Sequence, residues 1–181
     1  MDPIVVIEKY YDPQSIAYGY LVRHSRMVVK KALEIAEKVK HLSPDLRFIE
    51  EAAMLHDIGI ILTNTPEIGC YGDKPYVCHG YLGTELLKRE GLPRHALVCE
   101  RHVGAGITLE DIKAHNLPLP PRDMCPETLE EKIICFADKF YSKNANTLHQ
   151  EKKIEEIKNG LATFGKDKVE RFETWLKMFG Y

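Results

Sequence analysis

The sequence predicts an all-α protein that forms one compact domain of about six to eight helices. Apolar residues recur at steps of three and four along most of the chain, the spacing that gives a helix one buried face. Strict alternation of the strand type is confined to the short N-terminal stretch IVVIE. The length of 181 residues is enough for one sizeable core and too short to favour two complete domains. We therefore expect residues 1–181 to form a single domain.

A long first helix is expected from near Gln14 to near Lys40. Its apolar positions repeat at steps of three and four, and they are Leu21, Val28, Ala32, Ile35 and Val39. His24 falls on the same face, so it is predicted to occupy a core position.

The second helix is predicted to begin with Ser43 as N-cap and Pro44 at the first helical position, and to end at Gly59 as a C-cap. Its inner face is expected to comprise Leu46, Ile49 and Ala53. The same face continues into His56 and Asp57 at the C-terminal end. Since a carboxylate there opposes the helix macrodipole, Asp57 indicates a bound cation.

Residues 60–78 contain four breakers, Pro66, Gly69, Gly72 and Pro75. This pattern is typical of an irregular connection that covers a site, and we interpret it as a candidate lid. Two helices are then predicted, one from near His79 to Gly91 and one from about Pro93 to His102. Both histidines are therefore expected at helix ends, and Gly104 and Gly106 break the chain after them.

The C-terminal part of the chain predicts further helices. Thr108 and Asp111 resemble a capping box for a short helix, and the stiff stretch NLPLPPRDMCP follows it. The next long helix is expected to bury Leu129, Ile133, Ile134, Phe136, Ala137 and Phe140. Asp138 stands among these apolar neighbours. Within residues 151–180, two amphipathic stretches at 154–159 and 166–179 are interpreted as packing helices without convergent polar groups.

Composition excludes several classes of protein. The formal charge is −2 and the basic residues are scattered, so no duplex nucleic acid is expected as a partner. The N-terminal stretch lacks a basic start followed by a long apolar run, which predicts neither a secretory signal nor a membrane anchor. The five cysteines are odd in number and form no C-x-x-C pair, so we expect reduced thiols and a cytoplasmic protein.

Six polar residues form the most informative pattern, and they are His24, His56, Asp57, His79, His102 and Asp138. Most of them lie in partly apolar, helix-forming stretches, where an uncompensated polar group is costly. Neutral imidazole nitrogens and carboxylate oxygens are ligands of borderline transition metals. The set suits Fe, Mn, Co, Ni or Zn better than Mg or Ca, which prefer oxygen ligands. The sequence therefore predicts one or two divalent transition-metal ions. The other histidines, His41, His95, His115 and His149, match no pattern and are expected at the surface.

Three stretches of sequence resemble the signature of the HD-domain superfamily of metal-dependent phosphohydrolases, in its HDIG-containing subgroup. They are RHSRMV around His24, AAMLHDIG around His56 and Asp57, and CFADKF around Asp138, within roughly residues 15–143. The resemblance implies that these four residues bind one metal, with His56 and Asp57 as the catalytic pair. CHGYLG and ERHVGAG fit the extra histidines of two-metal members. Asp57 would then bridge a metal held by His24, His56 and Asp138 and a second one held by His79 and His102.

The resemblance also implies the reaction. A hydroxide held by the metals would attack a phosphomonoester, phosphoanhydride or phosphodiester of a small phosphorylated metabolite or nucleotide. A one-metal nucleotidase and a non-catalytic nucleotide-sensing module remain alternatives.

Two details of such a site stay open in the sequence. Ile60 stands where relatives often carry a phosphate-holding lysine, so Arg101, Lys139 and Lys74 are the expected substrate-binding cations. Acids that orient the imidazoles are also expected. Four are possible, and they are Glu50, Glu51, Glu100 and Asp111.

Overall fold

The computed structural model describes residues 1–141 and 150–181. His149 and the last two residues of the 15–143 stretch lie outside the described residues. The described part contains helices α1 (Pro3–Ile7), α2 (Ile16–Lys38), α3 (Leu46–Leu55), α4 (His79–Arg89), α5 (Pro93–Arg101), α6 (Leu109–Ala114), α7 (Leu129–Lys139), α8 (Ile154–Ala162) and α9 (Lys166–Phe179). Its only strands are the two-residue β1 (Asn64–Thr65) and β2 (Cys70–Tyr71), which pair antiparallel. The predicted all-α fold is confirmed, and the alternating N-terminal stretch is helix α1.

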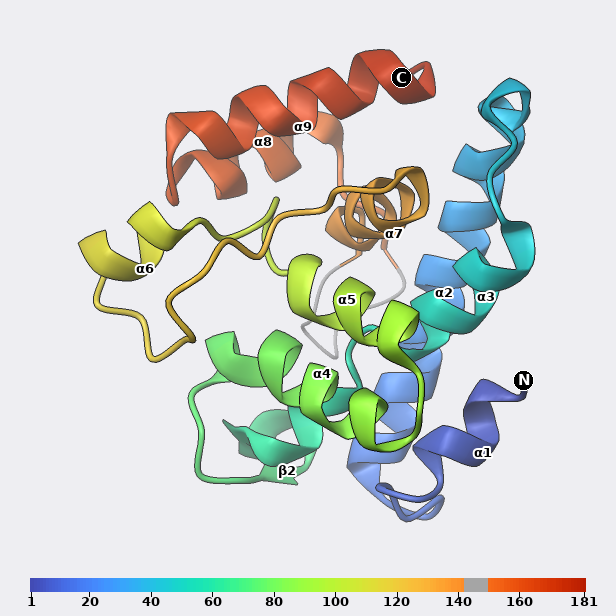
Figure 1. Cartoon of the computed structure of the whole chain (residues 1–181), viewed down its shortest axis with the longest axis vertical. Coiled ribbons are helices and arrows are strands. Elements are labelled where there is room, and N and C mark those ends of the chain that lie inside the picture. The colour runs from blue at the N-terminus through green and yellow to red at the C-terminus, as the bar shows by residue number, and fades with distance from the viewer. Residues whose placement is uncertain (142–149) are drawn as a thin grey trace.

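The described residues form two large apolar cores and a smaller third cluster. Figure 1 shows the helices from which the cores come. The first joins α2, α3, α7, α8 and α9, with Phe136 and Phe172 among its fully buried side chains. The second joins α1, α2, α4, α5 and the 3₁₀ turn η2 (Ile58–Leu62). Helix α2 spans both, since Leu21 belongs to the second core and Val28 to the first. His24 lies between these two residues, so the boundary between the cores passes through the position of a buried imidazole.

Helix α3 begins later and ends earlier than the sequence predicts. Its N-cap is Asp45, whose side chain accepts a hydrogen bond from the Phe48 N–H at 3.0 Å. This bond satisfies an amide of the first turn, whereas Ser43 adopts a left-handed conformation with φ 53° and closes the preceding turn η1 (Lys40–Leu42). The predicted start at Ser43 and Pro44 is therefore wrong. Leu46, expected on the inner face, is 50% exposed.

Gly59 lies within η2 and is not the C-cap of α3, which ends at Leu55. A Cβ atom on Gly59 would lie 2.1 Å from the His79 carbonyl oxygen and 2.4 Å from the Gly83 amide nitrogen. Real Cβ contacts are never this short, so only glycine lets η2 contact helix α4. This close approach brings the chain segment of His56 and Asp57 beside His79.

Residues 60–78 are more regular than an open connection. They include the end of η2, the β1–β2 pair, η3 (Pro66–Ile68) and η4 (Tyr76–Cys78). Ile60, Ile68 and Cys70 are buried in the second core. Part of this candidate lid is therefore packed into the domain, and the rest lies at its surface.

The remaining elements follow the sequence closely. The capping box of Thr108 and Asp111 is present at α6, and Thr128 and Glu131 form another at α7. All five cysteines lie in the described residues, and each thiol is free. No helix in the described ranges has the length and apolar content needed to cross a bilayer. His95 differs from expectation, because its ring packs edge-on against Phe48 with centroids 5.0 Å apart.

The close approach at Gly59 gives a test of the fold. We expect Gly59→Ala to lower the free energy of unfolding by about 2 kcal/mol or more, because the neighbouring backbone has to shift to admit the methyl group. The matched control is Gly19→Ala in α2, where a Cβ meets nothing within 4 Å. That variant should be neutral or slightly more stable. Urea unfolding measures both, and equal stability of the two variants would contradict the packing described.

Candidate metal centre

The six residues singled out from the sequence converge in one buried cluster. Their exposed fractions are 0% for His24, His56 and Asp57, 1% for His79 and His102, and 2% for Asp138. They come from α2, the end of α3, the start of η2, the start of α4, the end of α5 and α7. Segments distant in sequence therefore bring four imidazoles and two carboxylates together in the buried interior.

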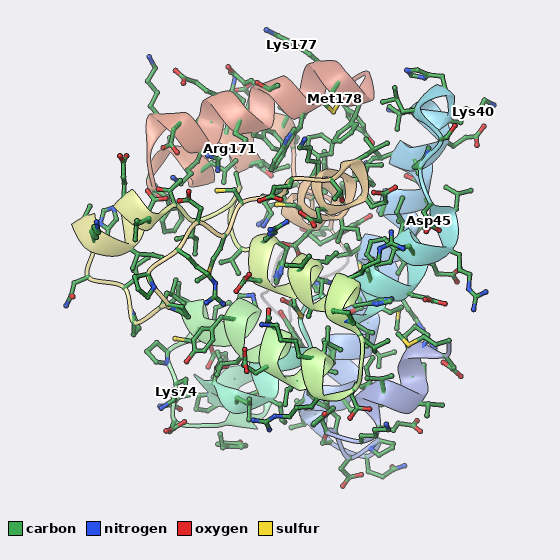
Figure 2. All side chains as sticks on the ribbon, in the orientation of Figure 1. Lys40, Asp45, Lys74, Arg171, Lys177 and Met178 are labelled. Carbon is green, nitrogen blue, oxygen red and sulfur yellow. The ribbon has the colours of Figure 1, made fainter. Side chains whose placement is uncertain are left out.

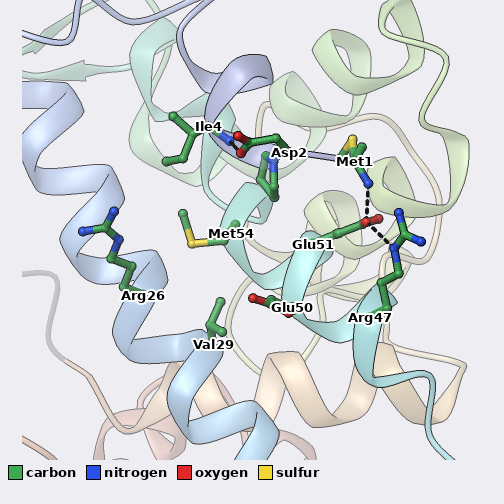
Figure 3. A pocket seen from close by; sticks show the side chains of 10 residues that line it. Met1, Asp2, Ile4, Arg26, Val29, Arg47, Glu50, Glu51 and Met54 are labelled. Carbon is green, nitrogen blue, oxygen red and sulfur yellow. Dashed lines mark hydrogen bonds and ion pairs between the residues drawn. The ribbon is translucent and has the colours of Figure 1, made fainter.

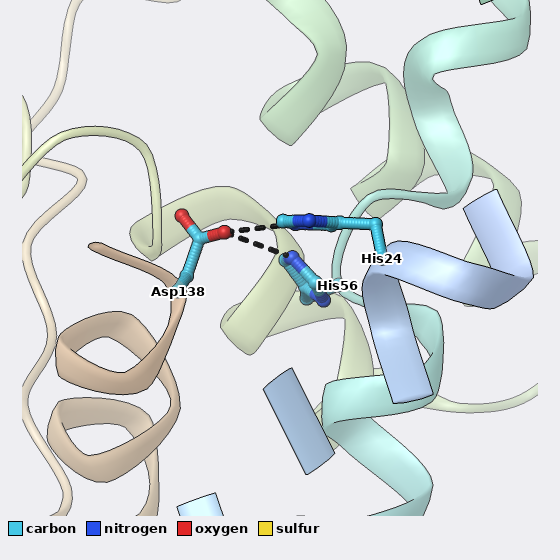
Figure 4. Close-up of side chains that lie close together, drawn as sticks. All are labelled: His24, His56 and Asp138. Carbon is cyan, nitrogen blue, oxygen red and sulfur yellow. Dashed lines mark hydrogen bonds and ion pairs between the residues drawn. The ribbon is translucent and has the colours of Figure 1, made fainter. Parts of the chain in front are cut away.

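One half of the cluster is formed by His24, His56 and Asp138 (Figure 4). Asp138 Oδ1 lies 3.0 Å from His24 Nε2 and 3.5 Å from His56 Nε2. The Oδ2 atom of Asp57 faces the same two nitrogens, at 3.4 Å from His24 and 3.6 Å from His56. Oxygens of both carboxylates thus face the Nε2 atoms of His24 and His56.

The other half is formed by His79 and His102. Asp57 Oδ1 lies 3.2 Å from His79 Nε2 and 3.1 Å from His102 Nε2, and the two nitrogens are 3.1 Å apart. Asp57 therefore stands between the two halves, with one carboxylate oxygen directed to each.

Backbone carbonyls fix the orientation of three of the imidazoles. The Nδ1 atoms of His56, His79 and His102 each lie 2.7 Å from the carbonyl oxygen three residues earlier, those of Ala53, Tyr76 and Cys99. A carbonyl can only accept, so Nδ1 carries the proton and Nε2 presents a lone pair to the cluster. Each of these histidines is the C-cap of a helical segment, α3, η4 and α5. The Ala53 and Cys99 carbonyls lie in the last turns of α3 and α5, where carbonyls lack an intrahelical partner, whereas the Tyr76 carbonyl also accepts the His79 backbone N–H.

The acids expected to orient the imidazoles have other partners or an exposed position, so that expectation is wrong for these three histidines. Glu51 binds the N-terminal amine and Arg47, Glu100 binds Arg122, and Asp111 binds Lys168. Glu50 is exposed. The sequence carried a usable signal, since all three histidines fall at predicted helix ends. The fourth ring, that of His24, stacks on Tyr20, and its buried Nδ1 has no hydrogen-bond partner among the described residues.

The donor set fits a divalent metal. The Nε2 lone pairs of His56, His79 and His102 face the Asp57 carboxylate at 3.1–3.6 Å, an arrangement that is repulsive unless a cation lies between them. Protonated imidazoles would supply that charge, but burial lowers the pKa of His102 to about 3 and also lowers the pKa of His24. Neutral imidazoles and carboxylates are the ligands that zinc, iron and manganese accept. Two groups of three residues have ligand atoms close enough together to hold a metal, and they are His24, His56 and Asp138, and His56, Asp57 and His102.

The three expected substrate-binding cations have different positions. The Lys139 ammonium lies at the cluster, 2.7 Å from Asp138 Oδ2 and 3.4 Å from the His102 carbonyl oxygen. The Arg101 guanidinium is held by Glu131 and Glu127, both at 3.1 Å. Lys74 is half exposed, pairs with Asp73 and lies at the edge of the molecule (Figure 2). Their roles in substrate binding stay predictions.

A surface cavity of about 540 Å³ near the N-terminus is separate from this chemistry (Figure 3). Its lining includes Arg26, Glu50 and Met54, and none of the six cluster residues. The ion pair of Glu51 with the N-terminal amine closes one side of it.

Comparisons with known proteins agree with this geometry. Residues 21–142 match the HD domain family. The chain is 37% identical to a tRNA (cytidine(56)-2'-O)-methyltransferase of Picrophilus torridus over 67% of its own length and 31% of the relative's. It is 35% identical to the protein of the same name in Thermoplasma volcanium, over 70% of this chain and 33% of that protein. The matched stretch thus spans about one third of these relatives.

Two further likenesses have different coverage. An uncharacterized protein of Methanocaldococcus jannaschii is 39% identical over 65% of this chain and 64% of its own length. The crystal structure of the HD domain of the L. monocytogenes phosphodiesterase PgpH superposes with a TM-score of 0.52 and 17% identity, over 85% of this chain and 88% of that one. The latter likeness shows a shared fold. Because the family match takes in most of the chain and the six residues come together as described, the chain belongs to the HD domain family.

Proposed function

We propose that this protein is a metal-dependent phosphohydrolase with a two-metal centre, acting on a small phosphorylated metabolite or nucleotide. The observation that carries the proposal is the position of Asp57, whose two oxygens face two separate sets of imidazole nitrogens. A carboxylate shared in this way holds two cations close together and screens their mutual repulsion.

Divalent ions bound here would supply a water acidic enough to act as a nucleophile at neutral pH, and positive charge for the phosphoryl oxygens. The chain's own residues prepare the site for that chemistry. The carbonyls of Ala53, Tyr76 and Cys99 hold three imidazoles in the ligating tautomer. Lys139 fixes the Asp138 carboxylate, and the near-complete burial of the cluster strengthens its electrostatic interactions.

The methyltransferase name of two relatives applies to proteins about three times as long as the matched stretch. The proposal for this chain therefore rests on its own site. A one-metal nucleotidase would leave His79 and His102 without a role, although both are buried and directed at Asp57. A nucleotide-sensing module would need no second set of ligands.

Phosphate release tests the activity. With Mn, Fe or Co added, the protein should release phosphate from members of a panel of mono- and dinucleotides and other phosphate esters. Asp57→Asn keeps the shape of the side chain but removes the charge, so turnover should fall by about 10²-fold or more. Binding of panel compounds without turnover by the wild-type protein would contradict the proposal and favour a sensing module.

Metal content tests the number of ions. Anaerobically loaded wild-type protein should contain about two ions per chain, and His79→Ala about one, because the second set of ligands is broken. His41→Ala, at an exposed histidine on η1, is the control and should keep both. Elemental analysis is the measurement, and a single ion in the wild-type protein, unchanged by His79→Ala, would favour the one-metal alternative.

The contact between Lys139 and Asp138 predicts a positioning role for this lysine. Lys139→Met should weaken metal binding about 10- to 100-fold, the usual effect of removing a group that orients a ligand. Lys132→Met removes a lysine two turns earlier on α7 that has no contact with the cluster, and it should have little effect. Isothermal titration calorimetry with the metal measures the affinity of both variants. Equal affinities of Lys139→Met and Lys132→Met would refute the positioning role of Lys139.

A further inference from the structure

A second cavity, of about 570 Å³, lies directly beside the metal centre. His79 forms part of its wall, and Tyr76 stacks on that imidazole with ring centroids 4.5 Å apart. Most of the remaining wall is apolar, with Val77, Val103, Ile107, Leu117, Leu161 and Phe164. Its polar side chains are Asp111, His115, Thr163 and Lys168. A group bound here would contact the metal centre at one end and apolar surface elsewhere.

Much of this wall comes from beyond the family match, which ends at residue 142. The cavity is lined by Leu161 of α8, by Phe164 in the connection between α8 and α9, and by Lys168 of α9. Lys168 is only 5% exposed and binds Asp111 of α6 at 2.6 Å. The expectation that the C-terminal helices lack convergent polar groups is therefore wrong, because this ion pair fixes α9 against α6 at the cavity wall.

The cations near the cavity and the metal centre are already paired. Lys168 Nζ lies 2.6 Å from carboxylate oxygens of both Asp111 and Asp167. Burial alone would lower the pKa of Lys168, but these two bonds outweigh burial and raise it. Arg101 is held by Glu127 and Glu131, and Lys139 by Asp138. Among the described residues, these lysine and arginine side chains offer no uncompensated charge to a second phosphate.

We propose that this cavity holds the uncharged, largely apolar organic part of a phosphomonoester whose single phosphate lies at the metal centre. This inference rests on the proposed function and specifies its substrate class. Additional phosphates would require unpaired cations, but Lys168 is paired with two carboxylates and, apart from His79, the other basic side chain of the wall is the exposed imidazole of His115. A hydroxyl-rich group such as a sugar would lose hydrogen bonds to water against the apolar side chains. An apolar group would gain affinity from burial.

Two phosphonates, which are not hydrolysed, test the cavity without requiring turnover. Phenylphosphonate and methylphosphonate share the charged group and differ in apolar size. Calorimetry on the metal-loaded protein should find phenylphosphonate bound about tenfold or more tightly, from the burial of its ring. Equal affinities for the two compounds would overturn the proposal.

Variants locate the binding site. Phe164 is 69% exposed, so Phe164→Ala should fold normally, weaken phenylphosphonate about three- to tenfold and leave methylphosphonate unchanged. Leu117→Gln, on another wall, should act in the same direction. Tyr71→Ala is the matched control, because Tyr71 is 78% exposed on β2 and does not line the cavity. If both cavity variants bind phenylphosphonate as tightly as the control does, the assignment of the cavity is wrong.

A panel of phosphate esters distinguishes failure of the proposed hydrolase activity from failure of the proposed substrate class. A preference for phenylphosphonate that depends on Phe164, together with no phosphate release from any ester, would contradict the proposed function and support the cavity assignment. Release from sugar phosphates or nucleoside triphosphates as fast as from phenyl phosphate would support the hydrolase and overturn the proposed substrate class.

Discussion

The structure depends on one electrostatic constraint, the convergence of four imidazole nitrogens and two carboxylates in the buried interior. Three of the imidazoles present Nε2 lone pairs to the Asp57 carboxylate at 3.1–3.6 Å, an arrangement that positive charge at its centre would stabilise. Burial opposes protonation of the imidazoles, as the lowered pKa values of His24 and His102 show. A divalent metal satisfies the constraint, and Lys139 supplies a smaller part of the charge from the side of Asp138.

The fold meets this constraint by placing the cluster where two apolar cores adjoin. Helix α2 contributes to both cores and carries His24 between them. Gly59 lets η2 lie against α4, which joins the segment of Asp57 to that of His79. Three helical segments end at histidines, and carbonyls three residues earlier accept the Nδ1 protons that orient these rings. The ends of these helical segments therefore orient three of the four imidazoles.

The sequence predicts the helical fold and the residues of the cluster well, because apolar periodicity and the spacing of His and Asp are local signals. It predicts local details less well where two nearby residues compete for a role. Asp45 replaces Ser43 as N-cap because its carboxylate reaches the Phe48 amide. The sequence predicts Gly59 as a C-cap, but in the structure its role is to let η2 contact α4. A contact between segments distant in sequence leaves no periodic pattern, so the sequence does not reveal it. The ion pair of Lys168 and Asp111 escapes prediction for the same reason.

The proposal that Asp57 bridges two metal ions is tested most directly by anomalous diffraction from crystals of the manganese-loaded protein. We predict two anomalous peaks a few ångströms apart. One should lie among His24, His56, Asp138 and Asp57 Oδ2, and the other among His79, His102 and Asp57 Oδ1. A single peak at full loading, or two peaks with Asp57 bound to only one of them, would contradict the account.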